Sequence, residues 1–291
     1  MSSVGFIGLG AMGSRIAGRL LDAGNELYGT NRTKSKAEPL IERGLQWRQS
    51  PRDVAAAADV VFSMVTDDAA LEAITSGPDG ILAGLHDGKV YVDMSTVSPR
   101  ISRRIAERVD PLSAQMLDAP VSGSIPQAES GTLAIFVGGS DTAFATAEPL
   151  LYELGQAVTH VGTHGQGLLV KLAVNISLAV QTLAFSEGLL LAERGGIDPR
   201  LAAEAMSTSS IGSPMLKARV PLLLDLPEHA WFDVALMAKD IRLAREAADE
   251  LSIPLPSAAV AAKVLADASD LGYAHRDLAA VHEVLAKSAT E

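Results

Sequence analysis

The 291-residue chain contains no cysteine, which excludes disulfide bonds and thiolate chemistry. A chain without cysteine suits a reducing compartment, and we expect a cytoplasmic protein. Positive charge is also in short supply, because 24 Lys and Arg stand against 35 Asp and Glu and give a net charge of −11. Nucleic-acid binding needs a basic face, so we expect no nucleic-acid partner. The opening residues, Met1-Ser2-Ser3, have neither the basic nor the apolar region of a secretion signal.

Uninterrupted hydrophobic runs are scarce as well, although hydrophobic residues make up 48% of the chain and suffice for real cores. One stretch, residues 168–192, is mostly Leu, Ala, Val and Ile. It also carries Lys171, Asn175, Gln181 and Glu187, and charges are expensive at the middle of a bilayer. We therefore interpret this stretch as a long helix buried between two protein domains, and we expect no membrane partner.

What is present is an alternation of short β-branched runs with helical segments, up to about Gly162. This alternation predicts an α/β domain with a largely parallel sheet covered on both faces. The last strands have little helix between them, which leaves antiparallel or mixed pairing open at that edge. The predicted strands are Val4–Ile7, Glu26–Gly29, Val60–Val65, Val90–Asp93, Gln115–Ala119, Leu133–Val137 and Ala157–His160, and the predicted helices are Ala11–Asp22, Ser35–Arg43, Asp67–Ile74, Pro99–Val109 and Asp141–Leu154.

Beyond that point the pattern is helical throughout and is punctuated by proline and glycine. Asp198-Pro199 is typical of an N-cap followed by a first-turn proline. We predict a Rossmann-like NADP-binding domain over residues 1–163 and an all-α substrate and oligomerisation domain over residues 164–291. A helix over Gly167–Arg194 would be about 40 Å long, enough to join the two domains and to line the cleft between them.

The most informative motif lies at the N-terminus, where the predicted strand Val4–Ile7 leads into Gly8-Leu9-Gly10-Ala11-Met12-Gly13 and then into a helix. In such a strand–turn–helix the first glycine permits a tight turn and the second lets the backbone approach a pyrophosphate. The third lets helix and strand pack closely. The N–H groups at the start of the helix then hold the phosphates. The whole run therefore predicts a dinucleotide site.

The end of the second predicted strand normally decides between NAD and NADP. An acid there binds the ribose 2′-OH, whereas a basic residue accommodates a 2′-phosphate. Here the chain reads Asn31-Arg32-Thr33, without an acid. Arg32 can form paired hydrogen bonds with a phosphate, and Asn31 and Thr33 can donate further ones. The alternative is a solvated turn in which the arginine has no role. We expect NADP(H) to be preferred over NAD(H).

Ligands in open α/β sheets bind where strands end, which directs attention to two further strand ends. In the segment Asp93–Pro99, Thr96 is placed to touch the nicotinamide half of the cofactor. The alternative is that this segment serves only to begin a helix, with Ser98 as N-cap before the proline. Met64 and Val65, at the end of another predicted strand, are also expected to contact the cofactor.

The segment Asp118–Ser124 consists of a strand end, a proline and then small residues. Such a loop can bind a carboxylate without a cation, through the Ser122 hydroxyl and the amides of Gly123 and Ser124. An ordinary turn would have the same composition, so the loop alone leaves both interpretations open.

Lys171 and Asn175 lie four residues apart on the long apolar helix and share one of its faces. Desolvating an ammonium is costly, so a lysine is seldom buried on such a helix for stability. The alternative is a lysine that reaches out to water, as helix lysines usually do. Its pairing with Asn175 beside a cleft favours a functional lysine.

Taken together, these motifs resemble the β-hydroxyacid dehydrogenases, in order and at the spacing of that family. The resemblance rests on the glycine-rich start, Asp118–Ser124, the pattern Gly-x-Gly-x-x-x-Lys-x-x-x-Asn over residues 165–175, and Lys239-Asp240. The family includes 3-hydroxyisobutyrate dehydrogenase, tartronate semialdehyde reductase and the glyoxylate/succinic semialdehyde reductases. The resemblance implies that Lys171 is the catalytic lysine and that Asn175 orients the substrate.

The resemblance also implies that Ser122 and Gly123 bind the substrate carboxylate and that Thr96 and Lys239 contact the cofactor. Phe232 matches an aromatic that packs near the site, and the Asn-Arg-Thr tripeptide looks like the NADP-preferring branch. Many members have a second glycine where this chain has Ser124. A non-glycine there is common in the branch that reduces semialdehydes, which leans away from 3-hydroxyisobutyrate as the substrate.

The implied reaction is hydride transfer between the nicotinamide and the carbonyl carbon of a small, carboxylate-bearing aldehyde, with Lys171 as general acid or base. Such acid–base help is worth ~10²–10⁴ in rate. One alternative is an imine reductase with the same two-domain plan, although those enzymes generally replace the lysine with aspartate or tyrosine. The other is a non-catalytic NADP-binding scaffold, since a fold alone confers no activity. No metal site is predicted.

The helical segments 233–251 and 256–271 have broad apolar faces. A helical domain of this kind usually needs more partners than one subunit provides. By analogy with the family we expect a homodimer or homotetramer built through these helices.

Overall fold

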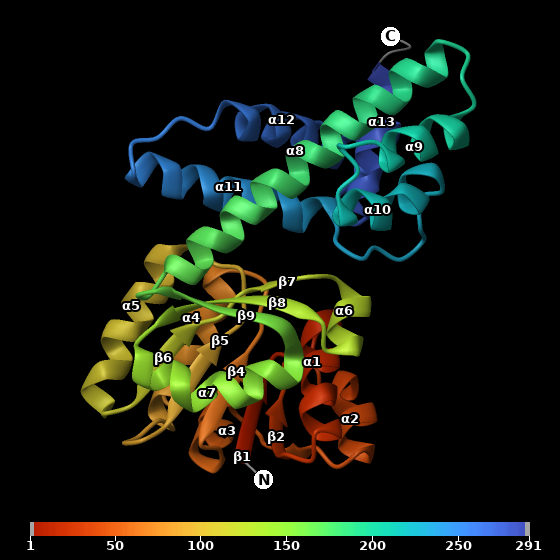
Figure 1. The fold of residues 1–291 in the computed structure, drawn as a ribbon. Coiled ribbons are helices and arrows are strands. Elements are labelled where there is room, and N and C mark those ends of the chain that lie inside the picture. Colours follow the sequence, from red (N-terminus) through yellow and green to blue (C-terminus); the bar gives the residue numbers. More distant parts are fainter. Residues whose placement is uncertain (1–2, 289–291) are drawn as a thin grey trace. The chain divides into compact units, whose positions relative to one another are not determined.

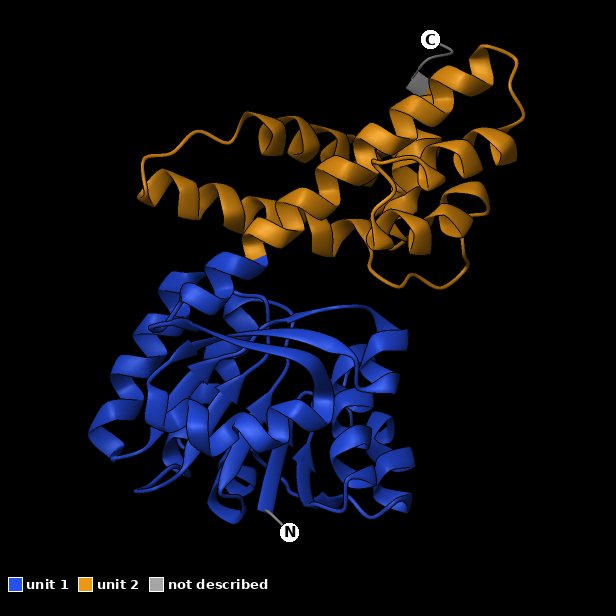
Figure 2. Ribbon diagram, viewed as in Figure 1, with its two compact units in different colours: residues 1–171 blue, residues 172–291 orange. Residues whose placement is uncertain are grey.

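The computed structural model describes residues 3–288, which form two compact units that divide between Lys171 and Leu172 (Figure 2). The division falls inside the long helix α8 (Gln166–Arg194), so the first turns of this helix belong to the first unit. The sequence-based boundary at residue 163 lies just before the helix begins.

The first unit is built on a sheet with the strand order β3-β2-β1-β4-β5-β6-β8-β7, and β9 pairs with β8 (Figure 1). Pairing is parallel from β3 across to β6, antiparallel where β8 meets β6 and β7, and parallel again between β8 and β9. The predicted parallel sheet with a mixed edge is confirmed. The strands are β1 (Ser3–Ile7), β2 (Glu26–Thr30), β3 (Gln46–Trp47), β4 (Val60–Ser63), β5 (Val90–Asp93), β6 (Gln115–Asp118), β7 (Val121–Ser122), β8 (Leu133–Gly139) and β9 (Gly155–Gly162).

Helices cover both faces of this sheet, because its strands are apolar on both sides. Phe6 belongs to one core cluster, where it stacks on Phe62, and its neighbour Ile7 belongs to the cluster on the opposite face. The helices of this unit are α1 (Ala11–Asp22), α2 (Glu38–Glu42), α3 (Pro51–Ala57), α4 (Asp68–Thr75), α5 (Pro99–Val109), α6 (Ile125–Ser130) and α7 (Asp141–Leu154), with short turns η1 (Lys34–Ala37), η2 (Ile81–Ala83) and η3 (Asp110–Leu112).

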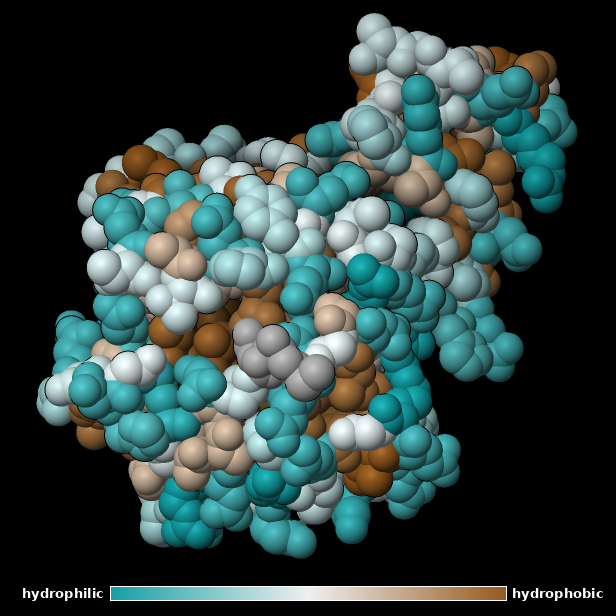
Figure 3. Space-filling model, turned by 60° about the horizontal axis from the view of Figure 1, so that its bottom comes forward, coloured by the Kyte–Doolittle hydropathy of each residue, from teal (hydrophilic) through white to brown (hydrophobic). Residues whose placement is uncertain are grey.

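The parallel strands end level with one another, which gathers the loops that carry the sequence motifs. In register, Ile7 pairs with Ser63, Ser63 with Asp93, and Asp93 with Asp118. The loops that follow these four residues therefore leave the sheet at the same edge. Figure 3 shows the face of the unit at which β1 begins, where hydrophilic residues predominate and hydrophobic ones appear in small groups between them.

The second unit is helical, as predicted, and α8 is its central element (Figure 1). Ala179 and Leu183 of α8 pack in one cluster with residues of α11 and α12, while Phe185 and Leu189 pack in another with residues of α9 and α10. The helices are α9 (Pro199–Thr208), α10 (Pro214–Leu224), α11 (Val234–Glu250), α12 (Pro256–Ala268) and α13 (Val281–Ser288), with short turns η4 (Ser269–Tyr273) and η5 (Leu278–Ala280).

By length and composition alone, α8 could cross a membrane, and 44% of its most apolar window is buried inside the protein. Its buried polar side chains include Asn175, Thr182 and Ser186. Packing in clusters with residues of five other helices, α9 to α13, accounts for the apolar composition of α8 within this unit.

Candidate active site

The glycine-rich loop between β1 and α1 has the geometry of a dinucleotide cradle. Gly8 has φ +94°, and a Cβ there would lie 2.2 Å from the carbonyl oxygen of Met64. A Cβ on Gly13 would lie 2.0 Å from the carbonyl oxygen of Gly8, so both positions require glycine for packing. At Gly10 a Cβ would meet nothing within 4 Å. The second glycine therefore opens space over the loop, which fits the approach of a pyrophosphate.

The start of α1 faces the same loop and offers its backbone N–H groups. Gly10 is the N-cap, and within residues 3–288 no side chain caps this helix end. The amides of Ala11 and Met12 begin the helix, where the positive end of the helix dipole favours an anion. Leu9 differs from its neighbours, because its side chain is buried and its N–H donates to the Asn31 side chain over 3.1 Å.

Asn31 was predicted as a hydrogen-bond donor to the cofactor, and the structure gives it internal partners. Its Oδ1 accepts from the Leu9 amide, and its Nδ2 donates to the Thr33 carbonyl over 2.9 Å. Asn31 thus joins the glycine-rich loop to the loop after β2. Arg32 and Thr33 are exposed beside it.

Two further cations lie near the end of β2. Lys34 lies over the ring of Trp47 at 5.6 Å, and Arg48 lies over the ring of Tyr28 at 4.5 Å. The Arg48 amide also donates to a carbonyl of β2. Arg32, Lys34 and Arg48 therefore place three positively charged side chains around the end of β2.

The loops after β4 and β5 are cross-linked beneath their exposed residues. The Val65 amide donates to Ser95 Oγ over 2.9 Å, and Ser95 Oγ donates to Asp93 Oδ1 over 2.6 Å. Ser63 Oγ donates to the same carboxylate oxygen over 2.7 Å. Thr96 is half-buried between neighbours that are fully buried, so it is the accessible point of its loop. Met64 and Val65 are half-buried in the facing loop.

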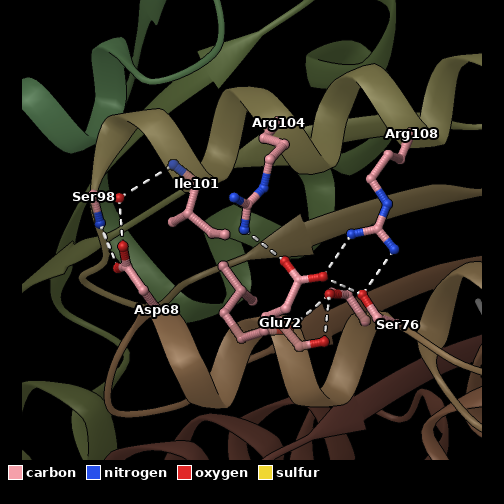
Figure 4. A network of polar contacts seen from close by, with 9 residues as sticks. Asp68, Glu72, Ser76, Ser98, Ile101, Arg104 and Arg108 are labelled. Carbon is pink, nitrogen blue, oxygen red and sulfur yellow. Dashed lines mark hydrogen bonds and ion pairs between the residues drawn. The ribbon is translucent and has the colours of Figure 1, made fainter.

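Side chains of α4 also bond the loop that follows β5 and the helix α5 after it (Figure 4). Asp68 accepts from the Ser98 amide over 2.8 Å and from Ser98 Oγ over 2.5 Å. Ser98 Oγ in turn accepts from the Ile101 amide, which confirms Ser98 as the N-cap of α5.

One turn further along α4, Glu72 accepts hydrogen bonds from Arg104 and Arg108, each over 2.8 Å (Figure 4). Ser76 donates to Glu72 and accepts from Arg108. The hydrogen bond from Ser76, followed by those from the two arginines, lowers the pKa of Glu72 to about 2. The carboxylate therefore stays charged, and the link between α4 and α5 persists, at any pH well above that value.

The predicted carboxylate loop begins at Asp118 and runs through β7 into α6. Gly123 has φ +137°, a conformation that favours glycine, and a Cβ there would lie 2.7 Å from Leu133. Ser122 is half-buried on β7. The Ser124 amide donates to Gln127 Oε1 over 2.9 Å. While that bond holds, the Ser124 amide is not available for the predicted contact to a substrate carboxylate.

Asp118 itself is fully buried and binds the start of α8. Its Oδ1 accepts from the Gly165 amide over 2.7 Å, and its Oδ2 accepts from the Leu168 amide over 3.0 Å. Burial raises the pKa of Asp118 to about 6, against the two hydrogen bonds, which lower it. Nothing in the local sequence around Asp118 predicted this contact, because its partners lie about fifty residues further along the chain.

On α8, Lys171 is 9% exposed and Asn175 is 1% exposed, so the lysine is nearly as buried as the asparagine that follows it one turn later. Asn175 Nδ2 donates to Asp240 Oδ2 over 2.5 Å, and the Lys239 ammonium lies 3.0 Å from Asp240 Oδ1. Asp240 therefore joins two predicted site residues of the helical unit. The motif Lys239-Asp240 named this residue, but the sequence pattern assigned a role only to Lys239.

The backbone at Phe232 is fixed by a second buried carboxylate. Asp277 Oδ2 accepts from the amides of Trp231 and Phe232 over 2.9 and 3.3 Å, and Oδ1 accepts from Arg219 over 3.0 Å. Burial lowers the pKa of Arg219, and the Asp277 carboxylate raises it. Asp277 and Arg219 were missed by the sequence analysis, which offers no periodic or motif signal for a pair so distant in the chain.

Among residues 3–288, no group of three or more histidine, aspartate or glutamate side chains is arranged to hold a metal ion. The glycine-rich loop, by contrast, fits a dinucleotide by the space over Gly10 and the uncapped start of α1. The titratable groups nearest the strand ends, Asp93 and Asp118, are engaged with hydroxyl and backbone donors.

Two family models cover the chain. The one described as "NAD binding domain of 6-phosphogluconate dehydrogenase" matches residues 3–162, and the one described as "NAD-binding of NADP-dependent 3-hydroxyisobutyrate dehydrogenase" matches residues 165–285. The chain is 35% identical over 283 residues to glyoxylate/succinic semialdehyde reductase 2 of Arabidopsis thaliana, an alignment that covers 97% of this chain and 79% of that protein.

Solved structures share the fold of this chain. A crystal structure of 3-hydroxyisobutyrate dehydrogenase from Salmonella typhimurium has a TM-score of 0.88 at 29% identity and covers 97% of this chain and 99% of that one. An imine reductase from Pseudomonas sp. has a TM-score of 0.65 at 24% identity over 98% and 99% of the two chains, a likeness of fold alone. By the two family models and the 35% identical relative, the chain belongs to the β-hydroxyacid dehydrogenase family and is an NAD(P)-dependent oxidoreductase.

Proposed function

We propose that this oxidoreductase uses NADP(H) to interconvert a small β-hydroxy acid and its semialdehyde, with Lys171 as general acid and base. The observation that carries the proposal is the burial of Lys171, which is 9% exposed, on a helix whose first turn is bonded to Asp118, the residue at the start of the Asp118–Ser124 segment. The names of its relatives support the substrate class, since one is a glyoxylate/succinic semialdehyde reductase.

In the reducing direction, negative charge grows on the carbonyl oxygen, and the Lys171 ammonium donates the proton that completes the hydroxyl group. In the oxidising direction the neutral amine accepts that proton. Asn175 holds the substrate hydroxyl or the lysine in register, and the bond from its amide to Asp240 fixes the orientation of that amide. The nicotinamide cofactor, when bound, supplies or accepts the hydride.

The Ser122 hydroxyl and the Gly123 amide anchor the substrate carboxylate at the other end. Fixing both ends of a short substrate brings its carbonyl into a reactive pose, a contribution that reaches several kcal/mol in well-oriented systems. Asp118, the Ser122–Ser124 loop and Lys171 belong to the same compact unit, and Asp118 bonds the first turn of the helix that carries the lysine.

A preference for NADP(H) is supported by the exposed Arg32 and by the cations of Lys34 and Arg48 around the end of β2. Arg32→Ala is expected to raise KM for NADPH about 10- to 100-fold, because a hydrogen bond to a charged group is worth ~1.5–3 kcal/mol. KM for NADH should stay within about twofold, because NADH has no 2′-phosphate. Steady-state kinetics with each cofactor at saturating substrate measures both values.

The matched control is Arg52→Ala, which removes a half-exposed arginine of the same unit that pairs with Asp53. It removes one positive charge, as Arg32→Ala does, and should leave both KM values unchanged. Equal effects of Arg32→Ala on NADPH and NADH would contradict the assignment.

The substrate class is tested by following NADPH absorbance with glyoxylate and with succinic semialdehyde, each beside an uncharged aldehyde of equal length. We expect the aldehyde acids to be reduced at least about tenfold faster in kcat/KM, since the carboxylate adds at least one charge-assisted contact. A cyclic imine is included as the competing substrate. Turnover of the imine alone, or equal turnover of charged and uncharged aldehydes, would defeat the proposal.

We further propose that the protein is a homodimer or homotetramer associated through its helical unit. Apolar side chains stand exposed on that unit, among them Leu191 at 77% and Val260 at 56% exposure. An interface between copies of this chain would remove these side chains from water, which is favourable for apolar surface.

A further inference from the structure

We infer that Asp118 is a positioning residue, whose carboxylate fixes the first turn of α8 and thereby the placement of Lys171 relative to the Ser122–Ser124 loop. The inference rests on the proposed function, because it takes Lys171 as the proton-transfer group. It concerns a part of the Gly-x-Gly-x-x-x-Lys pattern that neither cofactor nor substrate binding explains, namely the two glycines.

The first step is the capping of α8 by a distant side chain. The first amides of a helix have no partner within the helix and normally take one from a residue immediately before it. Here Asp118, from the end of β6, accepts from Gly165 just before α8 and from Leu168 in its first turn. One carboxylate thus holds the helix at two points and sets both its position and its rotation about its axis.

The second step is the glycine frame around this carboxylate. A Cβ on Gly167 would lie 2.8 Å from Asp118 Oδ2, and a Cβ on Gly138 would lie 2.7 Å from Oδ1. Gly165 has φ +85°, which turns its amide toward Oδ1 at a conformation that side chains rarely adopt. Gly167 therefore lets the helix start lie directly against the Asp118 carboxylate and against the Phe136 carbonyl oxygen, which would be 2.5 Å from the same Cβ, and Gly165 supplies the backbone turn that brings its amide to Oδ1.

The third step is the distance along the helix from this cap to the amine. Lys171 follows Leu168 by three residues, which is a rise of about 4.5 Å and nearly one full turn. A change in the cap therefore reaches Lys171 with little intervening chain to absorb it. At the other end, Asp118 is the last residue of β6, and the short segment after it leads into β7, which carries Ser122. The same residue consequently sets the separation between the amine and the carboxylate-binding loop.

The protonation state of Asp118 links its capping role to the stability of the protein as a function of pH. Its pKa is raised to about 6 from an ordinary 3.8, mainly by burial. Because the pKa of Asp118 is higher in the folded protein than in the unfolded one, the protonated carboxyl group stabilises the fold at pH values below the unfolded pKa. This stabilisation is lost as the pH rises through about 6. The charged form that caps α8 at neutral pH is therefore held at a cost to stability. The charged and titratable groups around it are Asp93 on β5, His164 before α8, His160 on β9, and Arg103 of α5, whose Nη1 lies against Gly165.

The test is Asp118→Asn, which keeps the size of the side chain and one acceptor oxygen but removes the charge. We expect kcat to fall about 10- to 100-fold, since a displacement of about 1 Å at a reacting group costs up to ~10²-fold. NADPH should still bind with one molecule per chain and with a dissociation constant within about threefold. The urea midpoint at pH 8 reflects two opposing effects, because removal of the desolvated charge raises it and the loss of one acceptor for the two amides lowers it. A purely structural cap would lower the midpoint and leave the kcat of the folded fraction unchanged.

Two measurements separate this inference from the proposed function. Hydrogen exchange of residues 163–171 should be faster in Asp118→Asn, and trace acetylation of Lys171, normalised to the exposed Lys217, should change at least about twofold. If the wild type reduces none of the aldehydes, the proposed function fails, and these two readouts still decide whether Asp118 places the amine.

The matched control is Asp198→Asn, which removes the same charge from the N-cap of α9, where Asp198 accepts from the amides of Arg200 and Leu201. Its kcat and Lys171 acetylation should equal those of the wild type. A kcat for Asp118→Asn within twofold of the wild type, or an unchanged Lys171 acetylation ratio, would overturn the inference.

Discussion

Lys171→Met is expected to lower kcat for aldehyde reduction by ~10²–10⁴, the usual worth of general acid–base help. Methionine keeps the length of the side chain and tolerates burial, so the loss reports the missing proton and charge rather than a packing defect. NADPH affinity should stay within about twofold, because the glycine-rich loop and Arg32 lie on other elements of the fold. Stopped-flow measurement of hydride transfer, with NADPH binding followed by its fluorescence, gives both quantities.

Lys171→Arg separates charge from proton transfer in the same experiment. Arginine remains protonated in proteins, so it can stabilise a developing negative charge but cannot deliver a proton. We expect it to recover part, but not most, of the lost rate. Lys217→Met, an exposed lysine on α10, is the matched control and should behave as the wild type. If Lys171→Met kept more than about a tenth of the wild-type kcat, the lysine would have no place in the proton transfer.

Asp277→Ala is expected to lower the free energy of unfolding of the helical unit by about 3–5 kcal/mol. The variant leaves Arg219, a residue that is 5% exposed, without its counter-charge, and it also removes the acceptor for the amides of Trp231 and Phe232. In a Trp47→Phe background, Trp231 is the single tryptophan left, so its fluorescence in a urea titration reports this unit alone.

The control for Asp277→Ala is His275→Ala, which removes a 91% exposed partner of Asp233. Exposed pairs contribute little, so this change should cost no more than about 0.5 kcal/mol. Arg219→Met in the Asp277→Ala chain should recover part of the loss, because the stranded charge is gone. Equal midpoints for Asp277→Ala and His275→Ala would show that the buried pair does not stabilise the unit.

Local patterns were enough to predict the parts of the fold that depend on neighbouring residues. The helices α1, α5 and α7 begin and end at the predicted residues, because each has a start signal and a long enough apolar period. The short strands β3 and β7 were missed, since two residues carry no period. The glycine-rich loop was predicted correctly as a fold element because Gly8 and Gly13 each have a local steric reason, while Gly10 leaves open space beside the loop.

The candidate site was less predictable wherever a buried carboxylate binds a group that is distant in the chain. Asp118, Asp240 and Asp277 each accept hydrogen bonds from residues far away in the chain. A sequence motif records that such a residue is present, but the identity of its partner depends on the folded topology. For the same reason Asn31, predicted to face the cofactor, was found bound to the glycine-rich loop.

The cross-link between the loops after β4 and β5 has a consequence for binding affinity. Ser95 accepts a hydrogen bond from the Val65 amide, and Asp68 accepts one from the Ser98 amide, and neither bond depends on a ligand. Ordering a mobile segment on binding costs conformational entropy, about 0.5–1.5 kcal/mol for each side chain immobilised. Loops that are already pre-organised avoid most of that loss, so a nucleotide that docks there keeps nearly the full benefit of its contacts.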